Sequence, residues 1–203
     1  MNDPLATPVG VLRFWLGACP PDTAAMLRVQ GQWFSKNEAF DAELRQRFGA
    51  TIAAARAGQL DGWAGDAQGR LALIIVLDQF TRNACRGQPE SFSGDAQALA
   101  LALEGIARGD DQRVPPMARI FCYLPLEHAE DPDMQAQSVA LLTALRDAPD
   151  AEPRAFFDSV EDYARRHQHV IAQFGRFPHR NAILGRTSTP EELAYLAQPG
   201  SGF

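Results

Sequence analysis

A run of seven consecutive apolar residues, 71–77 (LALIIVL), constrains the fold more than any other part of this sequence. In so short a run, periodicity alone cannot distinguish a buried strand from a buried helix. Asp66 is suited to cap a helix that begins just before the run, and the segment continues through Asp78 and Gln79. No alternating segment elsewhere in the sequence offers a partner strand. We therefore predict a central helix that is apolar on nearly all sides and buried.

The other patterned segments are also helical. With their expected caps, Ser93 and Thr189 among them, the predicted helices cover residues 9–16, 24–34, 37–48, 50–57, 93–109, 117–124, 133–145, 153–174 and 189–196. Gly49 and Pro125 are expected to end two of these helices. No linker or change of composition divides the 203 residues. We therefore predict one all-α domain, residues 1–203, built from antiparallel helix pairs.

Charge and cysteine content limit the classes of partner and compartment. The chain carries 25 acidic and 19 basic side chains, and its formal net charge is -6. This balance argues against duplex nucleic acid or an anionic membrane as a partner. The 3 cysteines lack metal-binding or redox spacing, which is typical of a reducing cytosol. With no signal peptide and no apolar span of membrane length, we expect a cytoplasmic protein.

Three segments place unusual polar residues beside large apolar ones. The first, residues 78–83 (DQFTRN), ends the predicted central helix. Asp78 and Arg82 are four residues apart and can pair on one helix face. Arg82 then either neutralises the Asp78 carboxylate at the edge of the core, or joins Asp78 and Asn83 in lining a ligand cavity.

The second segment, residues 123–131 (YLPLEHAED), is acidic and contains one histidine. Glu127 or Glu130 could serve as a general base, and His128 could act as an acid or base near neutral pH. Carboxylate and imidazole together also suit several divalent metal ions. Alternatively, the crowded acidic residues form a solvated connector between helices.

The third segment, residues 174–186 (FGRFPHRNAILGR), is rich in arginine. Residues 165–186 contain five arginines and three histidines but no Asp or Glu. Arginine binds carboxylates and phosphates through two hydrogen bonds, so this turn could form the wall of a polar pocket. Alternatively, its arginines satisfy carboxylates elsewhere in the chain. His167 lies on the apolar face of the preceding helix and is expected to point inward.

The predicted site draws on all three segments. The residues expected to handle protons are Glu127, His128 and His179. The residues expected to bind the ligand are Asp78, Arg82, Asn83, His167, Arg176, Arg180 and Asn181. No residue is assigned to a metal ion, and the cofactor is left open.

The same segments carry a resemblance to a known family. The strings LALIIVLDQFTRNACRG, YLPLEHAED and FGRFPHRNAILGR, with FW at 14–15, WF at 33–34 and STPEEL at 188–193, resemble the bacterial domain-of-unknown-function family nine-two-four. The resemblance implies a TPR-like fold, in which helix pairs stack into a right-handed superhelix. The motif residues of the family include Arg86 as well as the predicted site residues named above. The resemblance implies no particular activity. Thr81 stands where the family pattern has proline, a departure expected to affect helix termination more than chemistry.

Three functions remain as alternatives. The first is a polar pocket for a small anionic ligand, a carboxylate or phosphate, with Glu127 or His128 moving protons. The second is a TPR-like module that binds a peptide or protein along a concave face. The third is a metal-dependent hydrolase that uses His128, Glu127 and His179. The ligand, the reaction and the oligomeric state are left open.

Overall fold

The central apolar run is helical, as its flanking residues predict. Helix α4 (Ala67–Ile74) leads into a π-helical turn over Ile75–Phe80, and the helix ends as α5 (Thr81–Ala84). The Asp66 side chain caps the first turn by accepting a hydrogen bond from the backbone N–H of Gly69. The apolar run is buried throughout and forms the centre of the molecule.

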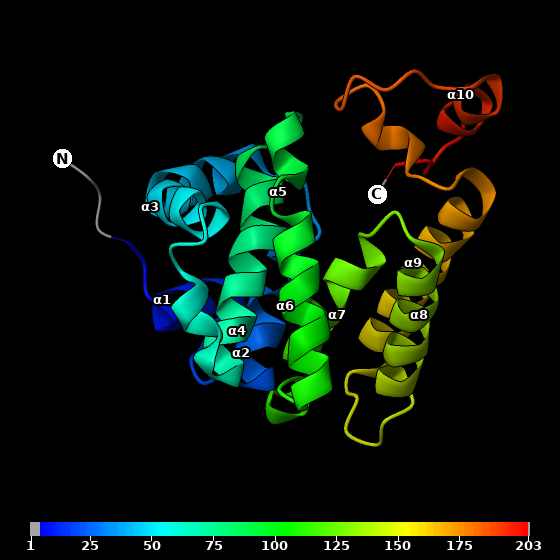
Figure 1. Ribbon diagram of the computed structural model, residues 1–203. Helices are drawn as coiled ribbons and strands as arrows, with labels where there is room; N and C mark the ends of the chain where they lie inside the picture. The colour runs from blue at the N-terminus through cyan, green and yellow to red at the C-terminus, as the bar shows by residue number, and fades with distance from the viewer. Residues whose placement is uncertain (1–4, 203) are drawn as a thin grey trace.

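The structure is a computed structural model that describes residues 5–202, so both ends of the predicted domain 1–203 lie outside the described residues (Figure 1). Within this range the chain forms helices and turns, without a strand, which confirms the all-α prediction. The other α-helices are α1 (Pro8–Leu16), α2 (Thr23–Val29), α3 (Glu38–Arg56), α6 (Asp95–Arg108), α7 (Pro116–Glu127), α8 (Pro132–Arg146), α9 (Arg154–Phe174) and α10 (Pro190–Leu196). Short 3-10 turns cover Gln30–Gln32, Asp61–Gly65, Pro89–Phe92, Asp111–Arg113 and Pro178–Arg180. No helix among the described residues has both the length and the apolar character needed to cross a bilayer.

Two helices continue past the residues expected to end them. Helix α3 runs through Gly49, next to the buried Phe48. A glycine costs a helix interior only about 1 kcal/mol relative to alanine, and burial of the neighbouring side chains outweighs this. Helix α7 runs through Pro125, which lies in its last turn between buried leucines. Glu127 is therefore helical and buried, which rules out a solvated connector at that residue.

The start of α6 also differs from the prediction. Gly94 occupies the N-cap position, whereas Ser93 was expected there, and no side chain caps the helix. A Cβ atom at position 94 would lie 2.3 Å from the carbonyl oxygen of Leu77. Only glycine allows this approach, so the beginning of α6 packs directly on the backbone of the central helix. Asp95, the first residue of α6, is thereby placed near the end of the central helix.

Helices that are neighbours in the sequence pack against one another. Helix α6 packs on α7, α7 on α8, and α8 along α9, while α4 lies between α1, α6 and α7 (Figure 1). One large apolar cluster takes residues from α1 to α9, with ring contacts among Trp15, Phe80 and Phe121. Helix α10 and the turn before it lie beyond the C-terminal end of α9 (Figure 1). The TPR-like superhelix stays a prediction.

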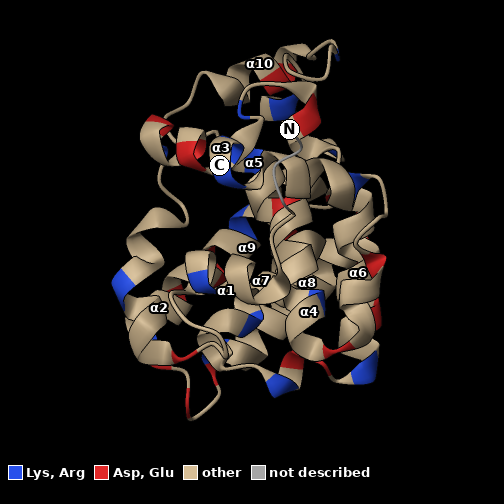
Figure 2. Cartoon of the chain, turned by 90° about the vertical axis from the view of Figure 1, so that its left-hand side faces the viewer, with Lys and Arg blue, Asp and Glu red and all other residues tan. Residues whose placement is uncertain are grey.

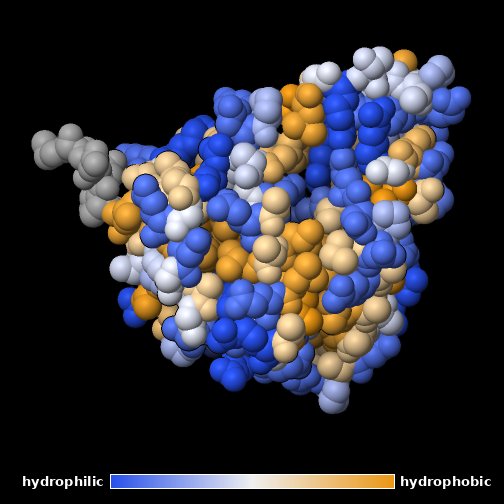
Figure 3. Space-filling view, in the orientation of Figure 1, coloured by the Kyte–Doolittle hydropathy of each residue, from blue (hydrophilic) through white to orange (hydrophobic). Residues whose placement is uncertain are grey.

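The surface is mixed in charge, and the centre of the face shown in Figure 3 is apolar. Basic and acidic segments are interspersed, and several of them gather around α10 (Figure 2). Apolar side chains gather over α6 and beside it (Figure 3). Helix α6 contributes the partly buried Leu99, Leu103 and Ile106 to a small apolar cluster that also includes Leu126 of α7.

Candidate functional site

Asp78, in the π-helical turn, lies at the centre of a cluster of polar groups. Its Oδ1 atom accepts hydrogen bonds from Arg82 Nη1 and from His128 Nδ1, each at 2.7 Å. Its Oδ2 atom accepts a third from Gln79 Nε2 at 2.6 Å. The predicted pairing of Asp78 with Arg82 is confirmed. His128, which follows the last residue of α7, joins the second polar segment to the first.

Asp78 and Gln79 belong to the π-helical turn, which Thr81 closes. Both the backbone N–H and the hydroxyl of Thr81 donate to the carbonyl oxygen of Val76, the hydroxyl at 2.9 Å. Turns of this kind insert a residue into an α-helix and occur often at functional sites. The helix continues through Thr81 to Ala84.

Asp95 brings the third segment into the cluster. The Arg82 guanidinium donates from Nη1 to Asp95 Oδ1 at 2.8 Å and from Nη2 to Asp95 Oδ2 at 2.9 Å. Arg180 Nη1 lies 3.5 Å from Asp95 Oδ2, and Arg180 Nη2 donates to the carbonyl oxygen of His128 at 3.0 Å. All three predicted segments therefore meet around Asp78, Asp95 and His128.

Arg180 is buried between two aromatic rings. Its guanidinium carbon lies 4.7 Å from the centre of the Phe92 ring and 4.5 Å from that of Phe177. Its Nε atom is buried and has no hydrogen-bond partner among the described residues. Burial, reinforced by the positive charge of Arg82, lowers the pKa of Arg180 to about 10. Arg180 is therefore charged at neutral pH but incompletely paired.

The environment fixes the charge states of Asp78 and His128. Burial opposes ionisation of Asp78, but Arg82 and His128 outweigh it and hold its pKa well below the usual range. Burial and the nearby Arg82 charge lower the pKa of His128, against the opposing effect of Asp78. His128 is thus neutral at pH 7 and donates from Nδ1 to the Asp78 carboxylate. Its Nε2 atom then carries a lone pair.

Glu127 differs from Asp78 in its protonation. Burial, with the negative charge of Asp78 as a smaller cause, raises the pKa of Glu127 to about 8. Its Oε1 atom lies 3.2 Å from His167 Nδ1, which also donates to the carbonyl oxygen of Tyr163 at 2.8 Å. Glu127 Oε2 is buried without a partner among the described residues. One neutral and one ionised carboxyl group therefore lie in the same cluster, which is a common arrangement in acid–base sites.

The prediction that His167 points inward from α9 is confirmed. His167 is buried, and burial lowers its pKa well below the ordinary value. His169 is exposed on the opposite side of α9. His179 lies on the same 3-10 turn as Arg180, with its ring 5.6 Å from that of Phe177. Burial and the Arg180 charge lower the pKa of His179 to about 4, so it is neutral at pH 7.

Two predicted ligand-binding residues of the third segment belong to a separate network. Arg176 donates to both carboxylate oxygens of Glu192, at 2.6 and 2.8 Å. Asn181 donates to the same carboxylate at 3.1 Å and to Ser188 at 3.0 Å. Glu192 also closes the predicted capping box at the start of α10, with Thr189 as the cap. Arg176 and Asn181 thus join the turn to α10 and do not reach Asp78.

Glu130 holds the turn against the end of α7. Its carboxylate accepts from Arg186 Nη1 at 2.6 Å, from Arg186 Nη2 at 2.9 Å and from the backbone N–H of Phe177 at 2.8 Å. For Arg176 and Arg186, the interpretation that the turn's arginines satisfy carboxylates elsewhere in the chain is therefore confirmed.

Asn83 and Arg86 also lie apart from the Asp78 cluster. Arg86 donates to the two carboxylate oxygens of Asp41 in α3, at 2.6 and 3.1 Å, and to Asn83 Oδ1 at 3.3 Å. This network fastens α5 to α3.

The cluster contains residues that the motifs did not identify. Asp95 and Phe92 were not predicted as site residues, yet they contact both Arg82 and Arg180. The available signal was the lack of Asp and Glu in residues 165–186, because arginines in such a segment need carboxylates from elsewhere. Which carboxylates they meet depends on the packing of α6 and cannot be deduced from local sequence.

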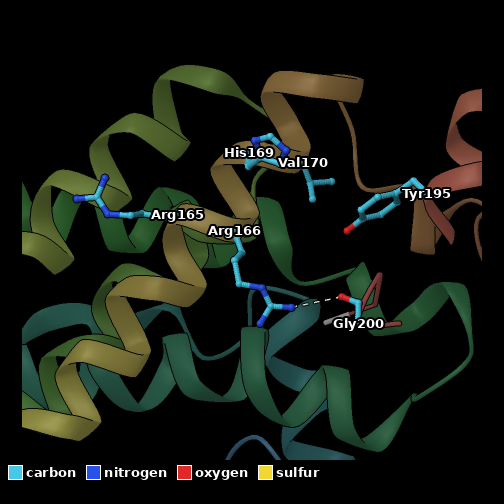
Figure 4. Close-up of a pocket in the computed structure, with 6 residues that line it drawn as sticks. All are labelled: Arg165, Arg166, His169, Val170, Tyr195 and Gly200. Carbon is cyan, nitrogen blue, oxygen red and sulfur yellow. Dashed lines mark hydrogen bonds between the residues drawn. The ribbon is translucent and has the colours of Figure 1, made fainter. Parts of the chain in front are cut away.

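The cluster reaches solvent at its rim. The side chains of Arg82, His128 and Asp95 are 17%, 15% and 23% exposed. Two surface hollows, of about 280 and 420 Å³, lie instead along α9 and include none of the predicted site residues. In the first, Arg166 and Tyr195 face the hollow, Arg166 donates to the Gly200 carbonyl oxygen, and Arg165 points away (Figure 4). No group of three or more His, Cys, Asp or Glu residues in the described part of the chain is placed to hold a metal ion.

Comparison with known proteins places the chain among bacterial relatives. No curated protein matches it. A solved structure, described as a protein of unknown function, ATU0120, from Agrobacterium tumefaciens, is similar with a TM-score of 0.75 and 38% sequence identity. The match covers 87% of this chain and 99% of that one. The family described as "Bacterial protein of unknown function (DUF924)" matches residues 11–200. The chain therefore belongs to this DUF924 family, as its sequence motifs indicate.

Proposed function

We propose that the Asp78 cluster binds a small anionic molecule, a carboxylate or a phosphate, and transfers a proton to or from it. The observation that carries this proposal is the incomplete pairing of Arg180. Of its five N–H groups, Nη2 donates to the His128 carbonyl oxygen, Nη1 is 3.5 Å from Asp95, and Nε has no partner among the described residues. A buried cation with unused donors is unfavourable unless an acceptor is supplied, and an anionic ligand supplies one.

The proton-transfer part of the proposal rests on His128 and Glu127. The Asp78 carboxylate orients the His128 ring through Nδ1, so that Nε2 serves as the general base. Glu127 holds its proton up to a pH of about 8 and serves as the general acid. His179, neutral and beside Arg180, is a further candidate for proton transfer. Arg82 both stabilises Asp78 and faces the ligand position.

Replacement of Arg180 by methionine tests this function. Methionine retains the packing between Phe92 and Phe177 but removes the charge and the donors. We expect the Arg180→Met variant to bind acetate and inorganic phosphate about tenfold more weakly or worse, because a charge-assisted hydrogen bond contributes this much. Binding is measured from shifts of the His128 ring signals by NMR. The matched control, Arg176→Met, loses contacts to Glu192 and to the Thr187 carbonyl oxygen, which lie outside the Asp78 cluster, and is expected to bind as the wild type does.

Two results would contradict the proposal: unchanged anion binding in a folded Arg180→Met protein, or equal loss in both variants. Circular dichroism and gel filtration establish whether each variant is folded. If Arg180→Met does not fold, Arg180→Lys replaces it, because lysine keeps the charge but not the forked geometry. The lysine variant is then expected to show weakened, charge-dependent binding.

A further inference from the structure

Asp95 is held as a bound carboxylate would be. Both of its oxygens accept from the Arg82 guanidinium, at 2.8 and 2.9 Å, which is the forked geometry that arginine adopts with carboxylates. Arg180 Nη1 approaches the same carboxylate at 3.5 Å. The Asp95 side chain is 23% exposed, while those of Arg82 and Arg180 are 17% and 8% exposed. The Asp95 carboxylate is thus more exposed to solvent than Arg82 and Arg180, the two largely buried arginines that it contacts.

Among the described residues, the Asp95 carboxylate accepts hydrogen bonds from Arg82 and from no backbone N–H group of α6. It occupies the first turn of α6, but the helix has no side-chain cap, and the hydrogen bonds of the Asp95 carboxylate go to Arg82. If the side chain turned outward, its charge would remain near the positive N-terminal end of α6 and would be solvated. The backbone would stay in place, because Gly94 packs on Leu77. A change of side-chain rotamer alone therefore vacates the position.

The charges around the Asp95 position favour a ligand that carries one negative charge. With Glu127 and His128 neutral at pH 7, the cations Arg82 and Arg180 face the anions Asp78 and Asp95. Removal of Asp95 leaves a single positive charge in excess. A carboxylate restores the balance, whereas doubly charged phosphate, whose share rises with pH, would exceed it close to the ionised Asp78.

We propose that the ligand of this site is a small carboxylic acid whose carboxylate replaces Asp95 between Arg82 and Arg180. This inference rests on the proposed function and specifies its ligand class. Arg82 Nη1 contacts both the Asp95 carboxylate and Asp78 Oδ1, and Asp78 Oδ1 accepts from His128. A carboxylate in place of Asp95 would therefore share the donor Arg82 Nη1 with Asp78, which in turn accepts from His128. Asp95 occupies the position in the ligand-free protein.

Removal of Asp95 tests the inference with acetate and inorganic phosphate as probes. We expect Asp95→Ala to lower the melting temperature by roughly 5 °C, because two buried cations lose their shared anion. Acetate should restore part of this loss in a saturable manner. Phosphate and chloride at the same ionic strength should not. The wild type should respond to acetate more weakly, because acetate must displace Asp95.

Asp41→Ala is the matched control. This change also removes a carboxylate that accepts two hydrogen bonds from one arginine. Among the described residues, however, a single arginine, Arg86, pairs with Asp41, and the Arg86 side chain is 38% exposed. We expect acetate to act on this variant no more than chloride does. An equal acetate response in both variants would overturn the inference, because any vacated arginine would then bind acetate. If Asp95→Ala does not fold, Asp95→Ser is used, since serine suits the first turn of a helix.

Failure of the carboxylate assignment can be distinguished from failure of the proposed function. If phosphate stabilises Asp95→Ala more than acetate does, and Arg180→Met abolishes the effect, the ligand is not a carboxylate but the anion site remains. If neither anion stabilises Asp95→Ala and neither shifts the His128 signals of the wild type, both proposals are wrong.

Discussion

At the scale of single residues, the main finding is that similar groups acquire different charge states in one cluster. Asp78 accepts three hydrogen bonds and stays ionised, while Glu127 has a buried, unpartnered oxygen and stays protonated. The sequence identified both carboxyl groups as candidates but could not separate them. Their difference arises from the number of donors that the fold brings to each.

Glu127 makes stability depend on pH in a predictable direction. Its pKa is raised from 4.5 to about 8 in the folded protein, so between these values the folded state holds a proton that the unfolded chain releases. Stability therefore falls as the pH rises through this range. Glutamine resembles the protonated side chain and removes the effect. We expect Glu127→Gln to match the wild type near pH 4 and to be more stable by a few kcal/mol at pH 8.

Urea unfolding of both proteins at several pH values measures this difference. Histidines that do not contact Glu127 contribute alike to both proteins, so their contributions cancel in the comparison. His167 lies 3.2 Å from Glu127 Oε1, but burial holds its pKa well below the ordinary value and keeps it neutral in the folded protein at neutral pH and above. A stability difference that does not change with pH would show that Glu127 is ionised in the folded protein.

At the scale of elements, close contact between helices places the site. Gly94 brings α6 onto the central helix and so brings Asp95 to Arg82. Asp78 in the π-helical turn contacts His128 at the end of α7. Proline and glycine did not end helices at Pro125 and Gly49, because burial of the neighbouring side chains outweighed local propensity.

The same glycine-to-alanine change is expected to have opposite effects in α3 and at the start of α6. At Gly94, a Cβ atom would lie 2.3 Å from the Leu77 carbonyl oxygen, so Gly94→Ala should cost about 1–3 kcal/mol and weaken the Asp95–Arg82 contact. At Gly49, nothing lies within 4 Å, so Gly49→Ala should gain about 0.5–1 kcal/mol. Chemical denaturation checks both. Equal effects at the two positions would show that α6 does not pack this closely.

At the scale of the whole molecule, a few charged contacts hold the C-terminal turn, residues 174–186, and α10 against the other helices. Glu130 accepts from Arg186 and from the backbone of Phe177, and Arg180 contacts Asp95 and His128. The turn brings Arg180 to the site, so its docking determines whether the cluster is complete.

Loss of the Glu130 contacts should release this turn. In Glu130→Ala, the Phe177 N–H loses its side-chain acceptor, and Arg186 keeps only its contacts within the turn, to Asn181 and the Phe177 carbonyl oxygen. We expect trypsin to cleave within residues 176–186 roughly tenfold faster or more. Glu152→Ala, on the connection between α8 and α9, is the control and should leave that cleavage rate unchanged. Equal cleavage of Glu130→Ala and the wild type would show that other contacts hold the turn.

The order of the residues was enough to predict an all-α chain with residues 71–77 in a buried central helix, and to single out three segments that place polar residues beside large apolar ones. These are properties of local periodicity and composition, which the order of the residues contains directly. Which arginine pairs with which carboxylate could be seen only in the folded protein. Arg82 and Arg180 share Asp95, Arg176 meets Glu192, and Arg186 meets Glu130. Ion pairs between distant segments depend on how helices pack, and that packing is set by the apolar core and by close contacts such as Gly94 on Leu77.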